Sequence, residues 1–192
     1  FGLDPNRRTP SGIKAAIIRE KGTNGEREMA YMLYLAGFDV KDVTMTDLIS
    51  GRETLEDINM VVYCGGFSNS DVLGSAKGWA GSFLFNPKAK AALDNFYARE
   101  DTLSLGVCNG CQLMMELGLI TPEDKKKGKM LHNDSHKFES NFLGVTVPMN
   151  RSVMFGSLSG SKLGIWVAHG EGKFSLPYPE DHYNVVLKIF IR

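Results

Sequence analysis

The apolar run Asn59–Cys64 (NMVVYC) constrains the fold of this chain more than any other stretch. It ends abruptly at Gly65-Gly66, as expected of a short strand that is buried on both faces. A second apolar run, Thr102–Val107, follows a helical pattern. Short apolar strands that alternate with helices are typical of a parallel sheet with helices on both sides. The sequence therefore predicts an α/β fold.

Other segments before Gly118 continue this alternation. Strands are expected at Lys14–Ile18 and Phe38–Val43. Apolar residues at helical spacing predict two helices, one with Met29, Met32, Leu33 and Ala36 and one with Ala91, Leu93, Phe96 and Tyr97. After Gly118 the segments are punctuated by glycine and favour strands, at Asn141–Val147, Leu163–Ala168 and Tyr183–Ile191. We expect these later strands to form an antiparallel extension of the sheet.

The composition argues against several classes of function. The 22 basic and 22 acidic residues cancel, so the chain lacks the positive field that attracts nucleic acid or anionic membranes. No apolar stretch approaches the roughly 18 residues of a membrane span. The three cysteines, an odd number at uneven spacing, do not suggest a disulfide framework. We expect a cytoplasmic protein that binds neither nucleic acid nor membrane.

The first residues have the composition of a linker. Residues 1–12 contain Pro5, Pro10 and Gly12, so we expect a linker there and a single domain over residues 13–192. The chain opens on Phe1 without a methionine, which suggests that it was cut from something longer.

Two cysteines lie three residues apart in the stretch Leu105–Gln112 (LGVCNGCQ). A Cys-x-x-Cys redox pair of the thioredoxin type would follow an early strand, whereas at least three candidate strands precede Cys108. A structural zinc would need a second ligand pair, which neither Cys64 nor the histidines of the polar loop supply, so no metal is expected. The third interpretation is a nucleophile elbow of the form G-x-C-x-G, from Gly106 to Gly110.

The elbow interpretation makes specific demands on the backbone. A sharp turn from strand to helix would hold Cys108 in a strained conformation, and glycine would be needed two residues before and two residues after it. The helix N-terminus would favour the thiolate and present backbone N–H groups to an oxyanion. Cys111 would lie one turn along the helix as a small core residue. G-x-C-x-G alone does not exclude an ordinary turn with incidental cysteines.

The longer pattern G-x-C-x-G-x-Q, completed by Gln112, resembles the signature of class I glutamine amidotransferases. Two further blocks agree with it, GGFSNSDVLGSAKGWA at 65–80 and NGEREMA at 24–30. In detail the blocks resemble large single-chain members that serve purine biosynthesis, over residues 13 to about 185. The resemblance implies a flavodoxin-like open, mostly parallel sheet with helices on both faces and a β-rich C-terminal extension.

The resemblance also implies roles for individual residues. Cys108 matches the nucleophile that attacks the side-chain amide of L-glutamine, releases ammonia and leaves a glutamyl thioester for water to cleave. The residues expected to supply the oxyanion hole are Gly66, Phe67 and Asn109. The residues expected to bind the substrate glutamine are Gly65, Gln112, His169, Gly170 and Glu171.

The catalytic base is the part of the family pattern that this sequence lacks. The family takes its histidine and glutamate from a later His-Pro-Glu motif, and none of the four histidines here precedes a proline. We therefore expect a domain truncated before that motif. The alternative is a triad of Cys108 with His169 and Glu171.

The resemblance implies a partner for the released ammonia. No cofactor is expected in this domain, whereas ATP and Mg are implied for a synthetase portion of the same polypeptide. That portion would convert formylglycinamide ribonucleotide to the amidine. Two rival interpretations remain, a cysteine hydrolase or chaperone of the same fold and a catalytically incomplete interaction module.

Overall fold

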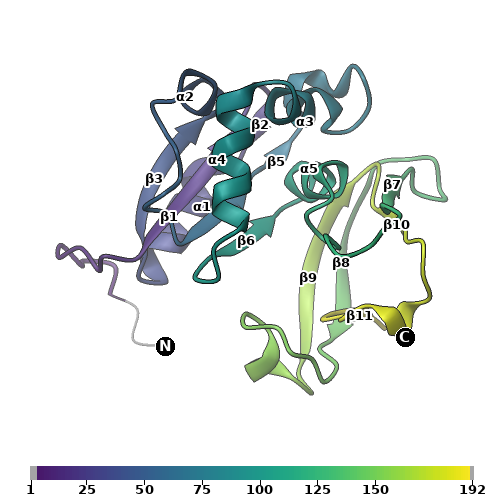
Figure 1. The fold of residues 1–192 in the computed structure, drawn as a ribbon. Coiled ribbons are helices and arrows are strands. Elements are labelled where there is room, and N and C mark those ends of the chain that lie inside the picture. Colours follow the sequence, from purple (N-terminus) through teal and green to yellow (C-terminus); the bar gives the residue numbers. More distant parts are fainter. Residues whose placement is uncertain (1–3, 191–192) are drawn as a thin grey trace. The chain divides into compact units, whose positions relative to one another are not determined.

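The computed structural model describes residues 4–190, and the chain forms two compact units, residues 1–122 and 123–192 (Figure 1). The first unit contains a parallel sheet in the order β3-β1-β4-β6. Its strands are β1 (Lys14–Arg19), β3 (Asp39–Thr44), β4 (Met60–Tyr63) and β6 (Leu103–Gly106). Numbered along the chain, these four strands lie in the order 2-1-3-4, which matches the start of the flavodoxin-like order. The predicted α/β fold is confirmed.

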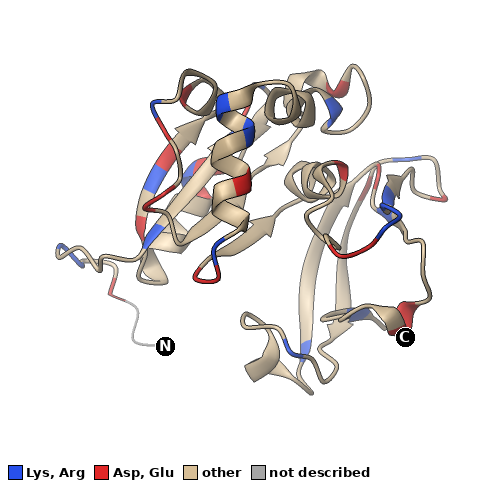
Figure 2. Cartoon of the chain, in the orientation of Figure 1, with Lys and Arg blue, Asp and Glu red and all other residues tan. Residues whose placement is uncertain are grey.

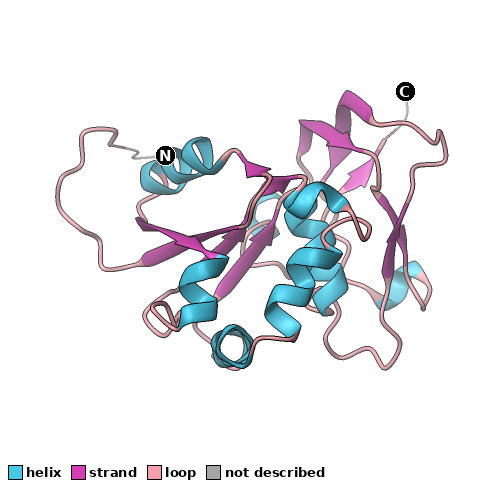
Figure 3. Cartoon of the chain, turned by 90° about the horizontal axis from the view of Figure 1, so that it is seen from above, coloured by secondary structure: helices cyan, strands magenta, loops and turns pink. Residues whose placement is uncertain are grey.

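Helices cover both faces of this sheet (Figure 3). Because successive side chains of a strand point to opposite faces, Ile17 of β1 packs with Leu33 of α1 (Glu26–Leu35), whereas Ile18 faces the other helices. Those other helices are α2 (Met45–Ser50), α3 (Lys77–Leu84), α4 (Pro87–Tyr97) and α5 (Asn109–Leu117). The carboxyl end of β6 therefore feeds the N-terminus of α5 on the more thickly covered face.

The strands and helices predicted for the first unit are present close to the expected bounds, but α2 and α3 were not predicted. A capping box begins α2, in which the Asp47 carboxylate accepts hydrogen bonds from the N–H and the hydroxyl of Thr44. Two glycines, Gly78 and Gly81, weaken the helical pattern of α3. Burial of Trp79 and its neighbours in the core stabilises that helix nonetheless.

The second unit contains two antiparallel sheets, β11-β8-β9 and β10-β7. Its strands are β7 (Lys129–Leu131), β8 (Glu139–Thr146), β9 (Lys162–His169), β10 (Lys173–Ser175) and β11 (Lys188–Ile189). The prediction that these strands extend the parallel sheet was wrong, because within residues 4–190 they pair only with one another. The long pairing of β8 with β9 gives hydrogen-bond partners to the backbone N–H and C=O groups on the facing edges of both strands.

The strand predicted at Tyr183–Ile191 was also wrong over most of its length. Only Lys188–Ile189 forms a strand, β11, and Ile191 lies outside the described residues. Just before it, the N–H of Val185 donates to the Tyr183 carbonyl at 3.0 Å. This turn takes the backbone out of the extended conformation that a longer strand needs.

The predicted linker has no helix or strand over residues 4–12, but it is anchored to the first unit. The Asp39 carboxylate accepts hydrogen bonds from the N–H groups of Ser11 (3.0 Å) and Gly12 (2.8 Å) and from the Arg7 guanidinium (3.0 Å). These donors lower the pKa of Asp39, the two backbone groups most strongly. The domain boundary at residue 13 stays a prediction.

Acidic and basic residues are interspersed along both units (Figure 2). Within residues 4–190, no helix combines the length and the apolar character that crossing a membrane requires.

Candidate active site

Cys108 lies at a sharp turn between β6 and α5. Its backbone angles, φ 50° and ψ −108°, fall outside the regions that residues with side chains prefer. A Cβ on Gly106 would lie 2.7 Å from the Gly110 carbonyl oxygen, and a Cβ on Gly110 would lie 2.1 Å from the Tyr63 carbonyl oxygen. Both positions exclude a side chain, so the predicted strained elbow with its two glycines is confirmed.

The N-terminus of α5 presents backbone donors beside Cys108. The Cys108 carbonyl accepts the N–H groups of Cys111 (2.9 Å) and Gln112 (3.1 Å), so the helical turn closes directly after the cysteine. The first N–H groups of a helix have no partner within the helix, and that of Asn109 is the first in α5. This position suits the predicted oxyanion-hole role of Asn109, which stays a prediction.

A short antiparallel pair, β2 (Thr23–Asn24) with β5 (Gly65–Gly66), places the glycine pair beside the elbow. A Cβ on Gly65 would lie 3.2 Å from the Cβ of Cys108, which is closer than most side chains allow. The backbone of Gly65 therefore lies directly against the cysteine.

The two predicted N–H donors of this loop, Gly66 and Phe67, differ in their hydrogen bonding. The N–H of Phe67 donates to the Gly22 carbonyl at 2.8 Å. Because hydrogen-bonded and non-hydrogen-bonded pairs alternate along antiparallel strands, we expect the N–H of Gly66 to point away from β2. The role of Gly66 as a donor stays a prediction. Phe67 as a donor stays a prediction, one that requires its present hydrogen bond to break.

The side chain of Asn109 is fully buried and joins three groups of the site. Its Oδ1 accepts the N–H of Ser68 at 3.1 Å, and its Nδ2 donates to Asp71 Oδ1 at 3.2 Å and to Gln112 Oε1 at 2.9 Å. Gln112 is also buried. The side-chain oxygen of Gln112 thus helps to fix the Asn109 amide. The role of Gln112 in holding the substrate stays a prediction.

The loop that Asn109 holds is strained. Asn69, Ser70 and Asp71 have φ values of 50°, 56° and 49°, in the left-handed region. Each such residue costs on the order of 1–3 kcal/mol and keeps this conformation only where its surroundings impose it. Sequence reasoning gave no individual role to Ser68 or Asp71, although both lie in the block at 65–80 that carries the resemblance. The run Asn-Ser-Asp is a signal for this strained turn, because asparagine and aspartate tolerate left-handed angles better than most residues.

In the second unit, the segment after β9 is organised by Asn133. This buried side chain accepts the N–H of Gly172 (3.0 Å), donates to the His169 carbonyl (2.8 Å) and contacts His169 Nδ1 (3.0 Å). The Asn133 N–H donates to the Gly170 carbonyl at 3.0 Å. The structure thus brings together the three predicted residues of this segment, including Glu171, whose Oε1 lies 3.5 Å from His132 Nε2.

Sequence reasoning missed Asn133 as the organiser of this turn. The distance along the chain from Asn133 to His169 explains why, since no periodicity links a loop asparagine to a segment more than thirty residues later. The roles of His169, Gly170 and Glu171 in binding glutamine stay predictions.

Comparison with known proteins decides the family. A family model described as a CobB/CobQ-like glutamine amidotransferase domain matches residues 12–188. This chain belongs to that family of glutamine amidotransferases. The family model thus matches nearly the whole chain, including the blocks on which the sequence resemblance was based.

Two relatives of this amidotransferase chain have known names. It is 47% identical over 170 residues to a probable phosphoribosylformylglycinamidine synthase, chloroplastic/mitochondrial, of Arabidopsis thaliana, covering 85% of this chain and 12% of that relative. It is 44% identical over 174 residues to the phosphoribosylformylglycinamidine synthase of Drosophila melanogaster, covering 88% of this chain and 13% of that relative. The chain therefore spans about an eighth of the length of these relatives.

The fold of the amidotransferase chain also has a solved counterpart. The structure of PurLQS from Thermotoga maritima matches with a TM-score of 0.74 and 26% sequence identity, covering 94% of this chain and 76% of that one. The likeness supports the assignment of the α/β architecture to the class I glutamine amidotransferase fold.

The two other thiols of the amidotransferase chain, Cys64 and Cys111, are both withdrawn from solvent to some degree. Cys64 is buried, and burial raises its pKa to about 11. Cys111 is half-buried; burial, and then the neighbouring Cys108, raise its pKa. Both therefore stay protonated at neutral pH, as expected of bystander thiols.

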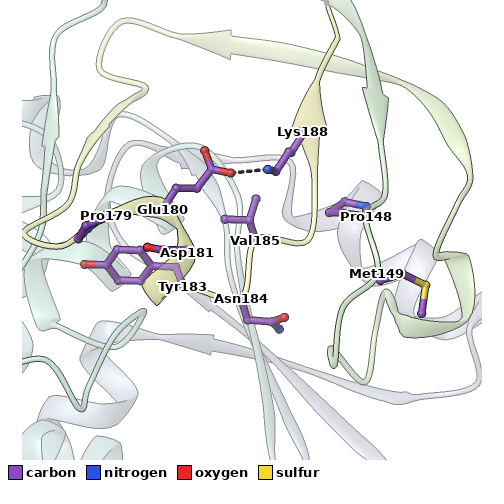
Figure 4. A pocket seen from close by; sticks show the side chains of 9 residues that line it. All are labelled: Pro148, Met149, Pro179, Glu180, Asp181, Tyr183, Asn184, Val185 and Lys188. Carbon is purple, nitrogen blue, oxygen red and sulfur yellow. Dashed lines mark ion pairs between the residues drawn. The ribbon is translucent and has the colours of Figure 1, made fainter.

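The described part of the chain holds no cluster of metal-ligating side chains, and a hollow in its second unit carries no buried charge. Within the described part of the chain, no group of three or more His, Cys, Asp or Glu side chains could hold a metal ion. A hollow of about 560 Å³ lies in the second unit (Figure 4). Lys188 and Glu180 form an ion pair on its wall. None of its lining residues was predicted as a site residue, and none of its lining side chains is a buried charge.

Proposed function

We propose that this chain is the glutaminase portion of a phosphoribosylformylglycinamidine synthase. It would release ammonia from L-glutamine for a synthetase portion of the same polypeptide, which would use ATP and Mg to convert formylglycinamide ribonucleotide to formylglycinamidine ribonucleotide. The observation that carries the proposal is the strained Cys108 at the elbow, with the Gly65 backbone against it. Relatives of the same name at 44–47% identity support it.

In the proposed reaction, Cys108 Sγ attacks the carbonyl carbon of the glutamine side-chain amide. The carbonyl oxygen gains negative charge, which the N–H groups of Gly66 and Asn109 stabilise in place. Collapse of this intermediate expels ammonia and leaves a glutamyl thioester, which water then cleaves to glutamate. A base must take the thiol proton and deliver a proton to the leaving ammonia, and we expect it from a His-Pro-Glu motif that residues 1–192 do not contain.

The rival interpretations lose support. A cysteine hydrolase or chaperone of the same fold does not account for a family match over residues 12–188. The cytoplasmic location expected from the sequence remains part of the proposal, and the Arabidopsis relative is named as chloroplastic/mitochondrial.

The test compares Cys108→Ala with Cys111→Ala in the protein expressed from its complete gene. Cys108→Ala is expected to abolish amidine formation with glutamine while retaining it with an ammonium salt. Cys111→Ala is expected to retain both. Glutamine-dependent amidine formation by the Cys108→Ala protein would sink the proposal.

A further inference from the structure

The loop from Ser68 to Asp71 joins the glycine pair beside Cys108 to the start of α3. On one side, the N–H of Asn69 donates to the Lys21 carbonyl at 2.7 Å. On the other side, Asp71 Oδ1 accepts the N–H of Ala76 at 3.2 Å, immediately before α3. Since Ala76 and Trp79 are fully buried, the far end of the loop is anchored in the core.

The middle of the loop is held by one side chain from the elbow itself. Asn109 offers one oxygen and two N–H groups, and three partners match them, namely the N–H of Ser68 and the oxygens of Asp71 and Gln112. Only an amide at residue 109 supplies both an acceptor and two donors of this size. A carboxylate there would keep the contact with Ser68 but would place its second oxygen against the Asp71 carboxylate.

These contacts connect to the oxyanion hole through the backbone. Ser68 follows Gly66 by two residues, and its N–H is fixed by Asn109 Oδ1. A shift of Ser68 therefore moves the Gly66 N–H relative to Cys108. The left-handed angles of residues 69–71 do not form without such support.

We propose that Asp71 and the Asn109 side chain form a clamp that holds the strained loop and thereby positions the Gly66 N–H for the developing oxyanion. Asp71 is a positioning residue in this proposal, because it acts through the loop. The proposal rests on the proposed glutaminase function. It adds Asp71, and the Asn109 side chain as distinct from its backbone, to the machinery of that site.

The test uses Asn109→Asp, Asp71→Ala and the exchange variant Asn109→Asp/Asp71→Asn in the protein expressed from its complete gene. Asp94→Asn, the same acid-to-amide change on the exposed side of α4, is the matched control. Three quantities are measured: kcat and KM for ammonia release from glutamine, the rate at which iodoacetamide alkylates Cys108, and hydrogen exchange of the amides in residues 66–72.

Asn109→Asp and Asp71→Ala are expected to lower kcat by about 10- to 100-fold, as for a misplaced catalytic group, with KM changed less than about threefold. In Asp71→Ala, alkylation of Cys108 should change less than about twofold, because displacement at a saturated carbon develops no oxyanion. Asn109→Asp is left out of this comparison, since its added charge beside the thiol disfavours the thiolate that reacts. Exchange in residues 66–72 should accelerate. The exchange variant should recover part of both losses, since an amide and a carboxylate again face each other, while the acceptor that Asp71 Oδ1 offers to the Ala76 N–H is lost.

Several results would overturn the clamp. They are an unchanged kcat in both single variants, alkylation that falls in parallel with kcat in Asp71→Ala, or no recovery in the exchange variant. Failure of the proposed function looks different, because the wild-type protein would then release no ammonia from glutamine. In that case hydrogen exchange still decides, and unchanged exchange of residues 66–72 in Asn109→Asp would refute the clamp itself.

Discussion

The two units of this chain are ordered by different interactions. In the part of the chain that the structure describes, every buried hydrophobic side chain except Val145 and Val147 lies in the first unit. In the second unit large apolar side chains are exposed, among them Phe142 and the 77% exposed Trp166. That unit is ordered instead by the pairing of β8 with β9 and by the hydrogen bonds of Asn133.

The difference explains where a strained cysteine can be supported. The unfavourable backbone angles of Cys108 persist only where the surrounding atoms are held rigidly, and a closely packed core holds them so. The second unit buries little apolar surface, so its local opening should cost less free energy than opening of the first. The predictions below test this contrast between the units.

The largest effect is expected from the two tryptophans, one in each unit. Trp79 is fully buried and packs edge-on against Tyr63, with 6.1 Å between the ring centroids. Trp79→Ala should cost about 3–5 kcal/mol of unfolding free energy, and Trp166→Ala under about 1 kcal/mol. Urea denaturation followed by circular dichroism at 222 nm measures the first change, since the described α-helices lie within residues 26–117, and amide exchange of β8 and β9 measures the second. Equal losses of unfolding free energy in the two units would contradict the contrast.

A matched pair of glycines gives the next effect. Gly110→Ala would place a methyl group 2.1 Å from the Tyr63 carbonyl oxygen, whereas Gly170→Ala meets its nearest neighbour, Phe138, at 3.8 Å. Overpacking against backbone should cost about 2–3 kcal/mol in the first case, and the second should stay within about 0.5 kcal/mol. The same urea titration measures Gly110→Ala, and amide exchange of β8 and β9 measures Gly170→Ala. An unchanged midpoint in Gly110→Ala would show that the elbow can rearrange to hold a side chain.

A smaller and more local effect is expected from Asn133→Ala in the second unit. The substitution removes the acceptor of the Gly172 N–H and a donor to the His169 carbonyl, at a cost of about 1–3 kcal/mol. Amide exchange at residues 170–172 should accelerate by about 10- to 100-fold, with the first unit unaffected. Asn141→Ala, an exposed change on β8, is the control. Unchanged exchange would mean that the β8–β9 pairing alone orders the segment.

The smallest effect concerns pH and the anchored linker. The pKa of Asp39 is lowered in the folded chain by the N–H groups of Ser11 and Gly12 and by Arg7. A lowered pKa means that the stabilisation is present above the unfolded value of about 3.9 and is lost as pH falls through the folded value. Exchange of the Ser11 and Gly12 amides, corrected for its intrinsic rate, should accelerate below about pH 4.

The same acceleration should appear at neutral pH in Asp39→Asn but not in Asp94→Asn. Amides that stay protected in Asp39→Asn would show that the carboxylate does not hold the linker.

Much of the first unit was predictable because its signals are local. The apolar runs at β4 and β6 predicted buried strands. The glycines around Cys108 predicted the elbow, and the structure confirms that a side chain at either glycine would clash with neighbouring atoms. In α3, Gly78 and Gly81 concealed the helix, because its stability comes from burial of Trp79 rather than from propensity. The arrangement of the later strands was predicted wrongly, because partner choice depends on contacts distant in sequence.

The sequence by itself determined the class of the fold and the glycines that let the backbone turn at Cys108, since each of these depends on neighbours within a few residues. Only the tertiary structure decided the network of Asn109 with Ser68 and Asp71, and that of Asn133 with His169 and Gly172. Both networks join segments some forty residues apart along the chain. The donors and acceptors of a side chain are fixed by its type, but which groups receive them is settled only when the chain packs.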